Sequence, residues 1–177
     1  MISIAAGTSV AALAAAWGKK ARIIRAMPNT PGAIGHGISG LFAARGTTDA
    51  DKRKATALLA ALGETVWVTK EDLIDSVTAL SGSGPAYLFL MAEAMTEAGI
   101  AEGFSREQAE KFARATVAGA GALLAADKSP ASALRQAVTS PGGTTEAALK
   151  VLMAEDGLVA LMKRAIHAAR ARAEELR

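Results

Sequence analysis

Cysteine is absent from the 177 residues. Its absence excludes a disulfide framework, a thiolate nucleophile and any metal site built on cysteine sulfur, and a reducing compartment fits this composition. Histidine is almost absent as well, because the only two, His36 and His167, stand far apart in the sequence. The sequence therefore predicts no metal site.

Aromatic residues make up only 4% of the chain, and the formal net charge is only +3. Lysines and arginines are spread among acidic residues instead of forming a block. A nucleic-acid surface gathers basic residues on one face, often beside aromatic side chains that stack on bases. We therefore expect no nucleic-acid partner.

Long apolar runs are also missing. The opening MISIAAGTSVAALAAAWGKK carries its lysines after the apolar part, whereas a secretory signal carries its positive charge before it. The run PAYLFLMAEAM contains Glu93 and is shorter than the roughly 20 residues that a membrane-spanning helix needs. The expectation is a soluble, cytoplasmic protein with no membrane partner.

Two regions with different patterns follow one another along the chain. Up to residue 70, runs rich in β-branched residues alternate with runs rich in Ala and Leu, which predicts an α/β arrangement of strands and covering helices. From Glu71 onward only helix signals occur, such as the proline starts at Pro85 and Pro130 and a capping box formed by Ser105 and Gln108. The predicted fold class is α/β plus all-α, with one domain in residues 1–70 and a helical one in residues 71–177.

A literal GxGxxG motif runs from Gly35 to Gly40. In a dinucleotide-binding fingerprint that loop follows a strand and opens a helix. Here it follows Pro28 and Pro31, and the LFAARG after it is too short for a helix. We interpret these residues as turn and strand rather than as a phosphate loop.

The stretch AVTSPGGTTEAAL, residues 137–149, leaves one helical pattern and enters another across Pro141, Gly142 and Gly143. A helix that begins near Thr144 has first amides without helical partners, and these favour an anion. Glu146 in the first turn could satisfy part of that demand. The alternative is a purely structural turn in which Thr144 or Thr145 caps its own helix. The segment SGSGPAY, residues 81–87, has the same ambiguity.

The helices of the second region are apolar on several faces. YLFLMAEAM is apolar nearly all round, and Gly119 and Gly121 offer small surfaces to a neighbouring helix. An apolar stripe in the final helix comprises Leu158, Leu161, Met162, Ala165, Ile166 and Ala169. Such faces predict burial against a second subunit, the alternative being a self-contained helical bundle.

Three stretches together resemble the pyrroline-5-carboxylate reductases of proline biosynthesis: AMPNTPGAIGHG, EDLIDSVTALSGSGPAY and LRQAVTSPGGTTEAALKVL. The resemblance covers the whole chain. It implies the last strands of a Rossmann-type domain that binds NADPH or NADH, followed by a helical dimerisation domain. It also implies the reduction of 1-pyrroline-5-carboxylate to L-proline by a homodimer, with rings of dimers in some members.

The resemblance also assigns site residues. It implies that the substrate carboxylate binds the amides of Thr144 and Thr145, and that the hydroxyl of Thr145, the catalytic candidate, hydrogen-bonds the ring nitrogen. The remaining substrate-binding candidates are Glu71, Ser140 and Gly143. The cofactor-binding candidates are Ile4, Ala5, Ala6, Met27 and Asn29. Ala137 departs from relatives that carry an asparagine there, and its methyl group cannot make that contact with the cofactor.

The family's opening βαβ units and their glycine-rich loop have no counterpart in these 177 residues. The expectation is a truncated gene product or a numbering that begins partway through a longer protein. Two functions stay open at this point, the reductase and a non-catalytic dimerisation module of the same family. The 177 residues alone are expected to dimerise without binding NADPH measurably, and the sequence does not distinguish NADPH from NADH.

Overall fold

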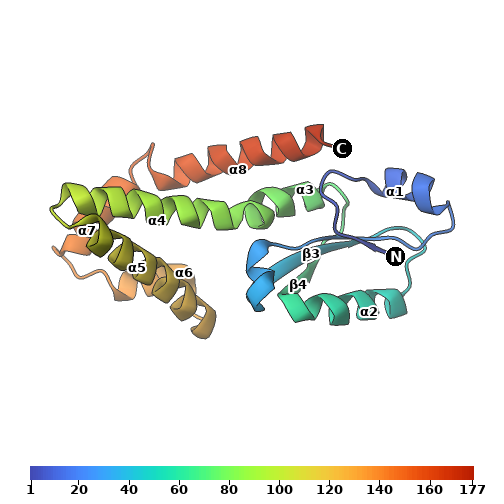
Figure 1. The fold of residues 1–177 in the computed structure, drawn as a ribbon, viewed down its shortest axis with the longest axis horizontal. Coiled ribbons are helices and arrows are strands. Elements are labelled where there is room, and N and C mark those ends of the chain that lie inside the picture. The colour runs from blue at the N-terminus through green and yellow to red at the C-terminus, as the bar shows by residue number, and fades with distance from the viewer. The chain divides into compact units, whose positions relative to one another are not determined.

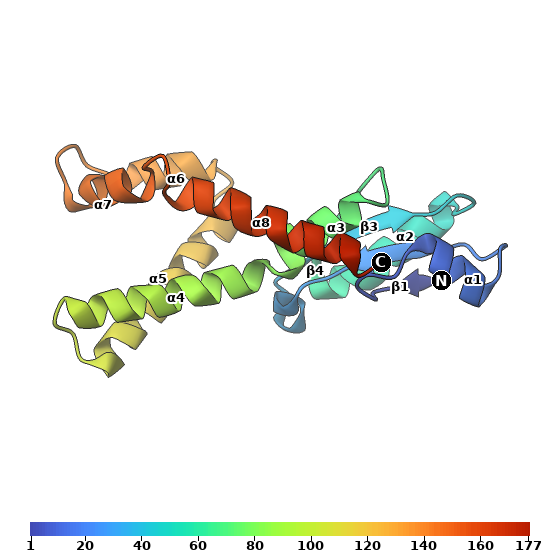
Figure 2. The same ribbon diagram turned by 90° about the horizontal axis from the view of Figure 1, so that it is seen from above.

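The computed structural model describes all of residues 1–177, which form two compact units. The first, called the sheet unit here, comprises Met1–Pro85 together with Arg164–Arg177. The second, the helical unit, comprises Ala86–Lys163. The domain boundary expected after residue 70 lies inside the sheet unit. Figures 1 and 2 show both units from two directions.

Strands and helices alternate through the sheet unit, as the sequence predicted. Its elements are β1 (Ile2–Ser3), α1 (Val10–Trp17), β2 (Ile24–Met27), a 3₁₀ turn η1 (Thr30–Ile34), β3 (Gly37–Ala43), α2 (Asp49–Leu59), a 3₁₀ turn η2 (Ala60–Leu62), β4 (Gly63–Trp67), α3 (Leu73–Val77) and a π-helical turn η3 (Thr78–Gly82). The last turns of α8 (Leu158–Glu175) complete the unit.

The four strands form one mixed sheet in the order β1-β2-β3-β4. β1 and β2 are parallel, β2 and β3 are antiparallel, and β3 and β4 are parallel. Ile24, Ala26 and Leu41 pack with Ala55 and Leu59 of α2 into a buried apolar cluster. Because successive side chains of a strand point to opposite faces, Arg25 and Met27 face away from α2.

The face of the sheet opposite α2 is covered by α3 and the last turns of α8 (Figure 1). α3 contacts β2 and β3, and Gly40 of β3 leaves room for the side chain of Val77, which a β-carbon at position 40 would meet at 2.6 Å. α1 packs separately, through Leu13 on Ile23 and Ala44.

The GxGxxG segment forms a turn and a strand, as predicted. Gly35 has a φ of 74°, in the left-handed region, and ends η1. β3 begins two residues later at Gly37. No helix opens at this motif, so its amides lack the geometry of a dinucleotide-binding loop.

The helical unit contains the rest of α4 (Gly84–Ala101), α5 (Arg106–Ala126), α6 (Ala131–Ala137), α7 (Thr144–Leu152) and the start of α8. The predicted starts are confirmed: Pro85 lies in the first turn of α4, Pro130 precedes α6, and Ser105 with Gln108 forms a capping box on α5. Ala109 of α5 packs close to Gly99 of α4. The predicted fold class is confirmed in both parts.

The helical unit buries very little of its apolar surface within one chain. Its buried residues are Thr96, Ala109 and Ala113, none of which is a large hydrophobic residue. Leu88, Phe89 and Leu90, three consecutive residues of α4, are 58–64% exposed. Such exposure is expected of helices that pack against a second subunit, and it argues against a self-contained helical bundle. No helix combines the length and the hydropathy that crossing a membrane would require.

Candidate active site

The loop that follows β1 carries three of the predicted cofactor residues. β1 and β2 run parallel, so their carboxyl ends lie at the same edge of the sheet. Ile4, Ala5 and Ala6 leave that edge and are exposed, Ile4 by 61%. Open α/β sheets bind ligands at this edge, and the two alanine methyl groups leave space beside the backbone.

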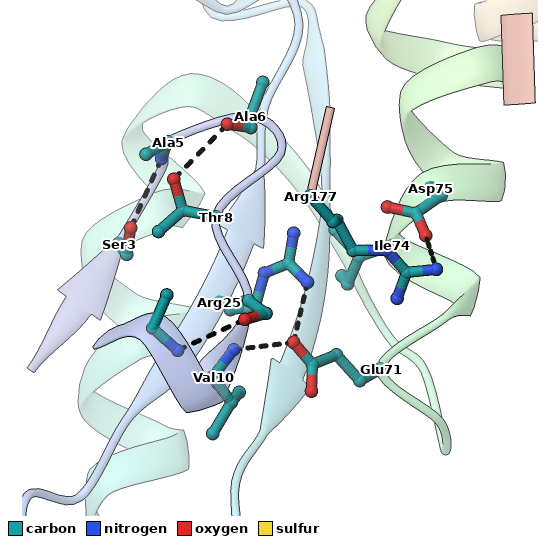
Figure 3. A network of polar contacts seen from close by, with 12 residues as sticks. Ser3, Ala5, Ala6, Thr8, Val10, Arg25, Glu71, Ile74, Asp75 and Arg177 are labelled. Atoms are coloured by element: carbon teal, nitrogen blue, oxygen red, sulfur yellow. Dashed lines mark hydrogen bonds and ion pairs between the residues drawn. The ribbon is translucent and has the colours of Figure 1, made fainter. Parts of the chain in front are cut away.

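Hydrogen bonds hold both ends of this loop (Figure 3). At its beginning, the amide of Ala5 donates to Oγ of the buried Ser3 at 3.3 Å. At its end, the amide of Val10, the first of α1, donates to Oε1 of Glu71 at 2.7 Å. Glu71 thereby partners a helix-start amide from a position 61 residues away in the sequence.

The same oxygen of Glu71 also accepts from Arg25. Nη1 of Arg25 lies 2.8 Å from Oε1, and the arginine side chain is only 3% exposed. Glu71, a predicted substrate residue, therefore connects the middle of β2 with the start of α1. Its second carboxylate oxygen has no partner within the chain.

Met27 and Asn29, the other two cofactor candidates, follow at the carboxyl end of β2. Asn29 is fixed by two bonds: its Oδ1 accepts from the amide of Ile38 at 3.0 Å, and its Nδ2 donates to Oγ of Ser81 at 3.4 Å. The methyl group of Met27 lies against Gly82 of η3. The structure thus brings all five cofactor candidates to one edge of the sheet, with Ser81 beside Asn29 and Gly82 beside Met27.

The turn before α7 carries the predicted substrate residues. Gly143 precedes the helix and provides no side-chain cap. The first α-helical bond runs from the amide of Ala147 to the carbonyl of Gly143 at 3.2 Å, so the amides of Thr144 and Thr145 have no partner within the chain. The interpretation that Thr144 or Thr145 caps its own helix is therefore wrong.

The turn residues explain why threonine does not cap. The amide of Gly143 donates to the carbonyl of Ser140 at 3.0 Å, and this turn places Gly143 in the capping position with Thr144 already helical. Gly142 has a φ of 71°, which favours glycine. A β-carbon on Gly143 would meet Oγ of Ser140 at 2.5 Å. Both glycines are thus required by the turn itself.

Glu146 does contribute its carboxylate to this turn. Its Oε2 accepts from the amide of Gly142 at 2.8 Å, as the sequence suggested, and leaves the amides of α7 itself available. Glu146 also lies 3.8 Å from Nζ of Lys150. The result is a helix start that presents the free amides of Thr144 and Thr145 and the hydroxyl of Thr145, an arrangement that suits a small carboxylate.

An open groove of about 460 Å³ lies between α6 and α7. Its lining residues are Arg135, Gln136, Thr139, Glu146, Leu149, Lys150 and Met153. None of the predicted site residues belongs to this lining. Glu146 lines the groove and also holds the turn before α7, so it connects the two features.

The predicted site residues are divided between the two units. The cofactor candidates and Glu71 belong to the sheet unit, whereas Ser140, Gly143, Thr144 and Thr145 belong to the helical unit. Ala137, the position that departs from relatives, is the exposed last residue of α6.

Sequence reasoning missed a second ion pair in the sheet unit. Oδ2 of Asp75, in α3, lies 2.8 Å from Nη2 of Arg177, and the aspartate side chain is only 2% exposed. Burial raises the pKa of Asp75 above its ordinary value, while Arg177 and Arg25 oppose that shift. The only signal in the sequence was a charged residue within an apolar helix or strand, which requires a partner once buried.

Comparison with known proteins places these features in a family. The family model described as pyrroline-5-carboxylate reductase dimerisation matches residues 71–176. The chain belongs to the pyrroline-5-carboxylate reductase family. The match spans the helices from α3 to α8 and includes the turn before α7, and the resemblance found in the sequence is thereby confirmed.

Individual relatives extend the similarity to the whole chain. The pyrroline-5-carboxylate reductase of Pseudomonas aeruginosa is 44% identical over 176 residues, covering 99% of this chain and 64% of its own length. Among solved structures, that of the Coxiella burnetii enzyme gives a TM-score of 0.93 at 44% identity, over 99% of this chain and 64% of that one. The chain thus spans 64% of the length of these relatives.

A more distant solved structure carries a nucleotide. The pyrroline carboxylate reductase of Plasmodium falciparum, determined with NADP bound, is 28% identical and gives a TM-score of 0.84, with 99% of this chain and 66% of that one covered. The fold of this chain is therefore that of a family member crystallised with a dinucleotide.

Proposed function

We propose that the protein reduces 1-pyrroline-5-carboxylate to L-proline with NADPH or NADH. One observation carries the proposal: α7 begins with the unpartnered amides of Thr144 and Thr145 and the hydroxyl of Thr145, in a chain of this reductase family. Such a helix start is suited to the carboxylate of the substrate. The relatives described above are pyrroline-5-carboxylate reductases, which supports the choice of substrate.

Each residue of the turn before α7 has a role in this proposal. The amides of Thr144 and Thr145 bind the carboxylate, with the dipole of α7 adding to the attraction. Gly143, which has no side chain, leaves room for the five-membered ring, and Ser140 holds the turn through its carbonyl. The substrate is then oriented by backbone groups that a rigid turn fixes in place.

Thr145 is the proposed catalytic residue. Its hydroxyl hydrogen-bonds the imine nitrogen and stabilises the charge that changes there during reduction. When bound, the reduced nicotinamide supplies a hydride to the imine carbon, and the nitrogen carries the matching proton in the product. The threonine thus positions and polarises the C=N bond. Its hydroxyl does this as a hydrogen-bond donor and does not need to act as a strong acid.

The cofactor candidates fit a nicotinamide. Ala5 and Ala6 are exposed at the sheet edge with small side chains, and Asn29 is held by Ile38 and Ser81 in a fixed orientation. We propose that Ile4, Ala5, Ala6, Met27 and Asn29 line its binding site. The NADP in the Plasmodium falciparum structure supports this cofactor class for the family.

Glu71 remains a proposed substrate residue through its second carboxylate oxygen. The bonds that its Oε1 makes to Arg25 and Val10 support another role, which is to position the cofactor loop. Kinetics of Glu71→Gln distinguish the two roles. Substrate contact predicts a raised KM for the imine, whereas loop positioning predicts a raised KM for the nucleotide.

We further propose that residues 1–70 belong to a nucleotide-binding domain and that residues 71–177 form a dimerisation and substrate-binding domain. The start of the family match at residue 71 and the apolar exposure of α4 support this division. The assembly proposed is a homodimer, and rings of such dimers are the higher assembly proposed for the same fold.

The test is an assay of the protein in its full natural length. Oxidation of NADPH or NADH should depend on added 1-pyrroline-5-carboxylate and should yield proline. Cyclopentane carboxylate should compete with the substrate, whereas cyclopentanol, with the same ring and no carboxylate, should not. Absence of imine-dependent oxidation would refute the proposed activity, and equal inhibition by the two rings would refute the role of the α7 amides.

A further inference from the structure

Two contacts join the end of α8 to the rest of the sheet unit. The backbone of Leu176 lies against Gly7, in the loop after β1, so closely that a β-carbon on Gly7 would meet the carbonyl oxygen of Leu176 at 2.6 Å. One residue further, Nη2 of Arg177 pairs with Oδ2 of Asp75 at 2.8 Å (Figure 3). The end of α8 therefore contacts both the cofactor loop and α3.

The other end of the loop is held from the same side. Glu71, two residues before α3, binds the amide of Val10 and the guanidinium of Arg25. The carbonyl of Glu71 accepts from the amide of Ile74, so that Glu71 and Asp75 are fixed on one short element. Anything that anchors α3 thereby anchors Glu71 and the start of α1.

We infer that Asp75 and Arg177 are positioning residues: their ion pair docks the end of α8 on α3 and holds the loop Ile4–Gly7 in the conformation that accepts the nicotinamide. The pair is well placed for this because Asp75 is buried and Arg177 is 30% exposed, so the contact is shielded from water on one side. The coupling to catalysis rests on the proposed function of the loop, whereas the positioning itself does not.

Gly7 provides the steric part of the same contact. Its φ of 67° lies in the left-handed region, which side chains disfavour, and the space above it is filled by Leu176. Gly7→Ala should therefore push the loop and the end of α8 apart. This variant disturbs the contact without removing a charge.

Hydrogen exchange of the 177-residue chain tests the positioning directly. In Arg177→Gln, exchange in a peptide covering residues 4–13 should become about threefold faster or more, because the amides of Ala5 and Val10 lose protection. Arg177→Lys should recover part of it. The control Arg172→Gln removes an exposed partner of Glu175 on the same helix and should leave this peptide unchanged. Unchanged exchange in Arg177→Gln would overturn the inference.

Kinetics of the protein in its full natural length test the coupling to the cofactor. Arg177→Gln and Gly7→Ala should raise the KM for NADPH about fivefold or more with little change in the KM for the imine. Faster exchange of the loop with an unaltered KM for NADPH would overturn the coupling. If the wild type lacks activity, the proposed function fails, and the exchange measurement still decides the positioning.

Discussion

Arg25, in the middle of β2, and Glu71, two residues before α3, form an ion pair of 2.8 Å. The same carboxylate oxygen accepts from the first amide of α1, that of Val10, at 2.7 Å. The guanidinium is almost completely removed from water. A buried charge of this kind is costly unless it is paired, so the glutamate is required by the fold once Arg25 occupies the strand.

Glu71→Ala should therefore lower the free energy of unfolding by about 3 kcal/mol, because Arg25 is left buried without its acid. The measurement is urea denaturation. Arg25→Met combined with Glu71→Met should be closer to wild type, since no charge remains unpaired. The control Glu64→Ala alters an exposed side chain of β4 and should change stability by no more than about 0.5 kcal/mol. Equal effects of Glu71→Ala and Glu64→Ala would contradict the assignment.

Local patterns were sufficient to predict most of the fold. The alternation of β-branched and Ala-rich runs predicted the α/β arrangement of the sheet unit, and proline or capping boxes located the starts of α4, α5 and α6. The mixed direction of the strands and the π-helical turn at Thr78–Gly82 did not follow from those patterns. Both depend on packing between segments distant in the sequence.

The candidate site, like the fold, was predicted where it depends on local sequence and missed where it depends on tertiary contacts. The glycine turn before α7 is a local feature, and both the turn and the helix start at Thr144 were located correctly. The alternative of a threonine cap was wrong because the Ser140–Gly143 turn places Gly143 in the capping position. The partners of Arg25 and Asp75 could not be identified from the sequence. Glu71 is 46 residues from Arg25, and only the tertiary fold brings them together.

Thr145→Ala should lower kcat about tenfold to a hundredfold in the full-length enzyme, because one hydrogen bond to the reacting nitrogen is worth roughly 1–3 kcal/mol. KM should change less, since that bond strengthens as the transition state forms. Thr145→Ser keeps the hydroxyl and should retain most of the rate. Thr69→Ala, an exposed position outside the site, is the control for steady-state kinetics. A wild-type kcat for Thr145→Ala would remove Thr145 from the mechanism.

The raised pKa of Asp75 predicts a specific dependence of stability on pH. The folded protein holds this proton to a higher pH than the unfolded chain, so above about 3.8, the ordinary value, the stability contributed by Asp75 falls as pH rises through its raised pKa. The wild type should therefore lose unfolding free energy relative to Asp75→Asn as pH rises through that window. The difference between the two proteins should level off towards neutral pH.

Denaturation at a series of pH values checks this direction. In Arg177→Gln the window should extend to higher pH, because a cation that opposes the shift is removed. The opposite result, in which the wild type becomes more stable relative to Asp75→Asn as pH rises, would contradict the prediction. It would mean that pairing with Arg177 lowers the pKa of Asp75 more than burial raises it. That result would also strengthen the ion pair's role in docking α8.

The exposed apolar side chains of α4 predict that the 177-residue chain dimerises. Leu88, Phe89 and Leu90 are more than half exposed in the single chain, and no large hydrophobic residue of the helical unit is buried. Burying such side chains contributes about 1.5–3 kcal/mol each, enough for association in the micromolar range when several do so. Sedimentation equilibrium should give twice the monomer mass, and Phe89→Asp should shift the population towards monomer. Glu107→Gln, an exposed polar change on α5, should leave the dimer intact. A folded monomer of the unaltered chain at micromolar concentration would show that these faces are covered in another way.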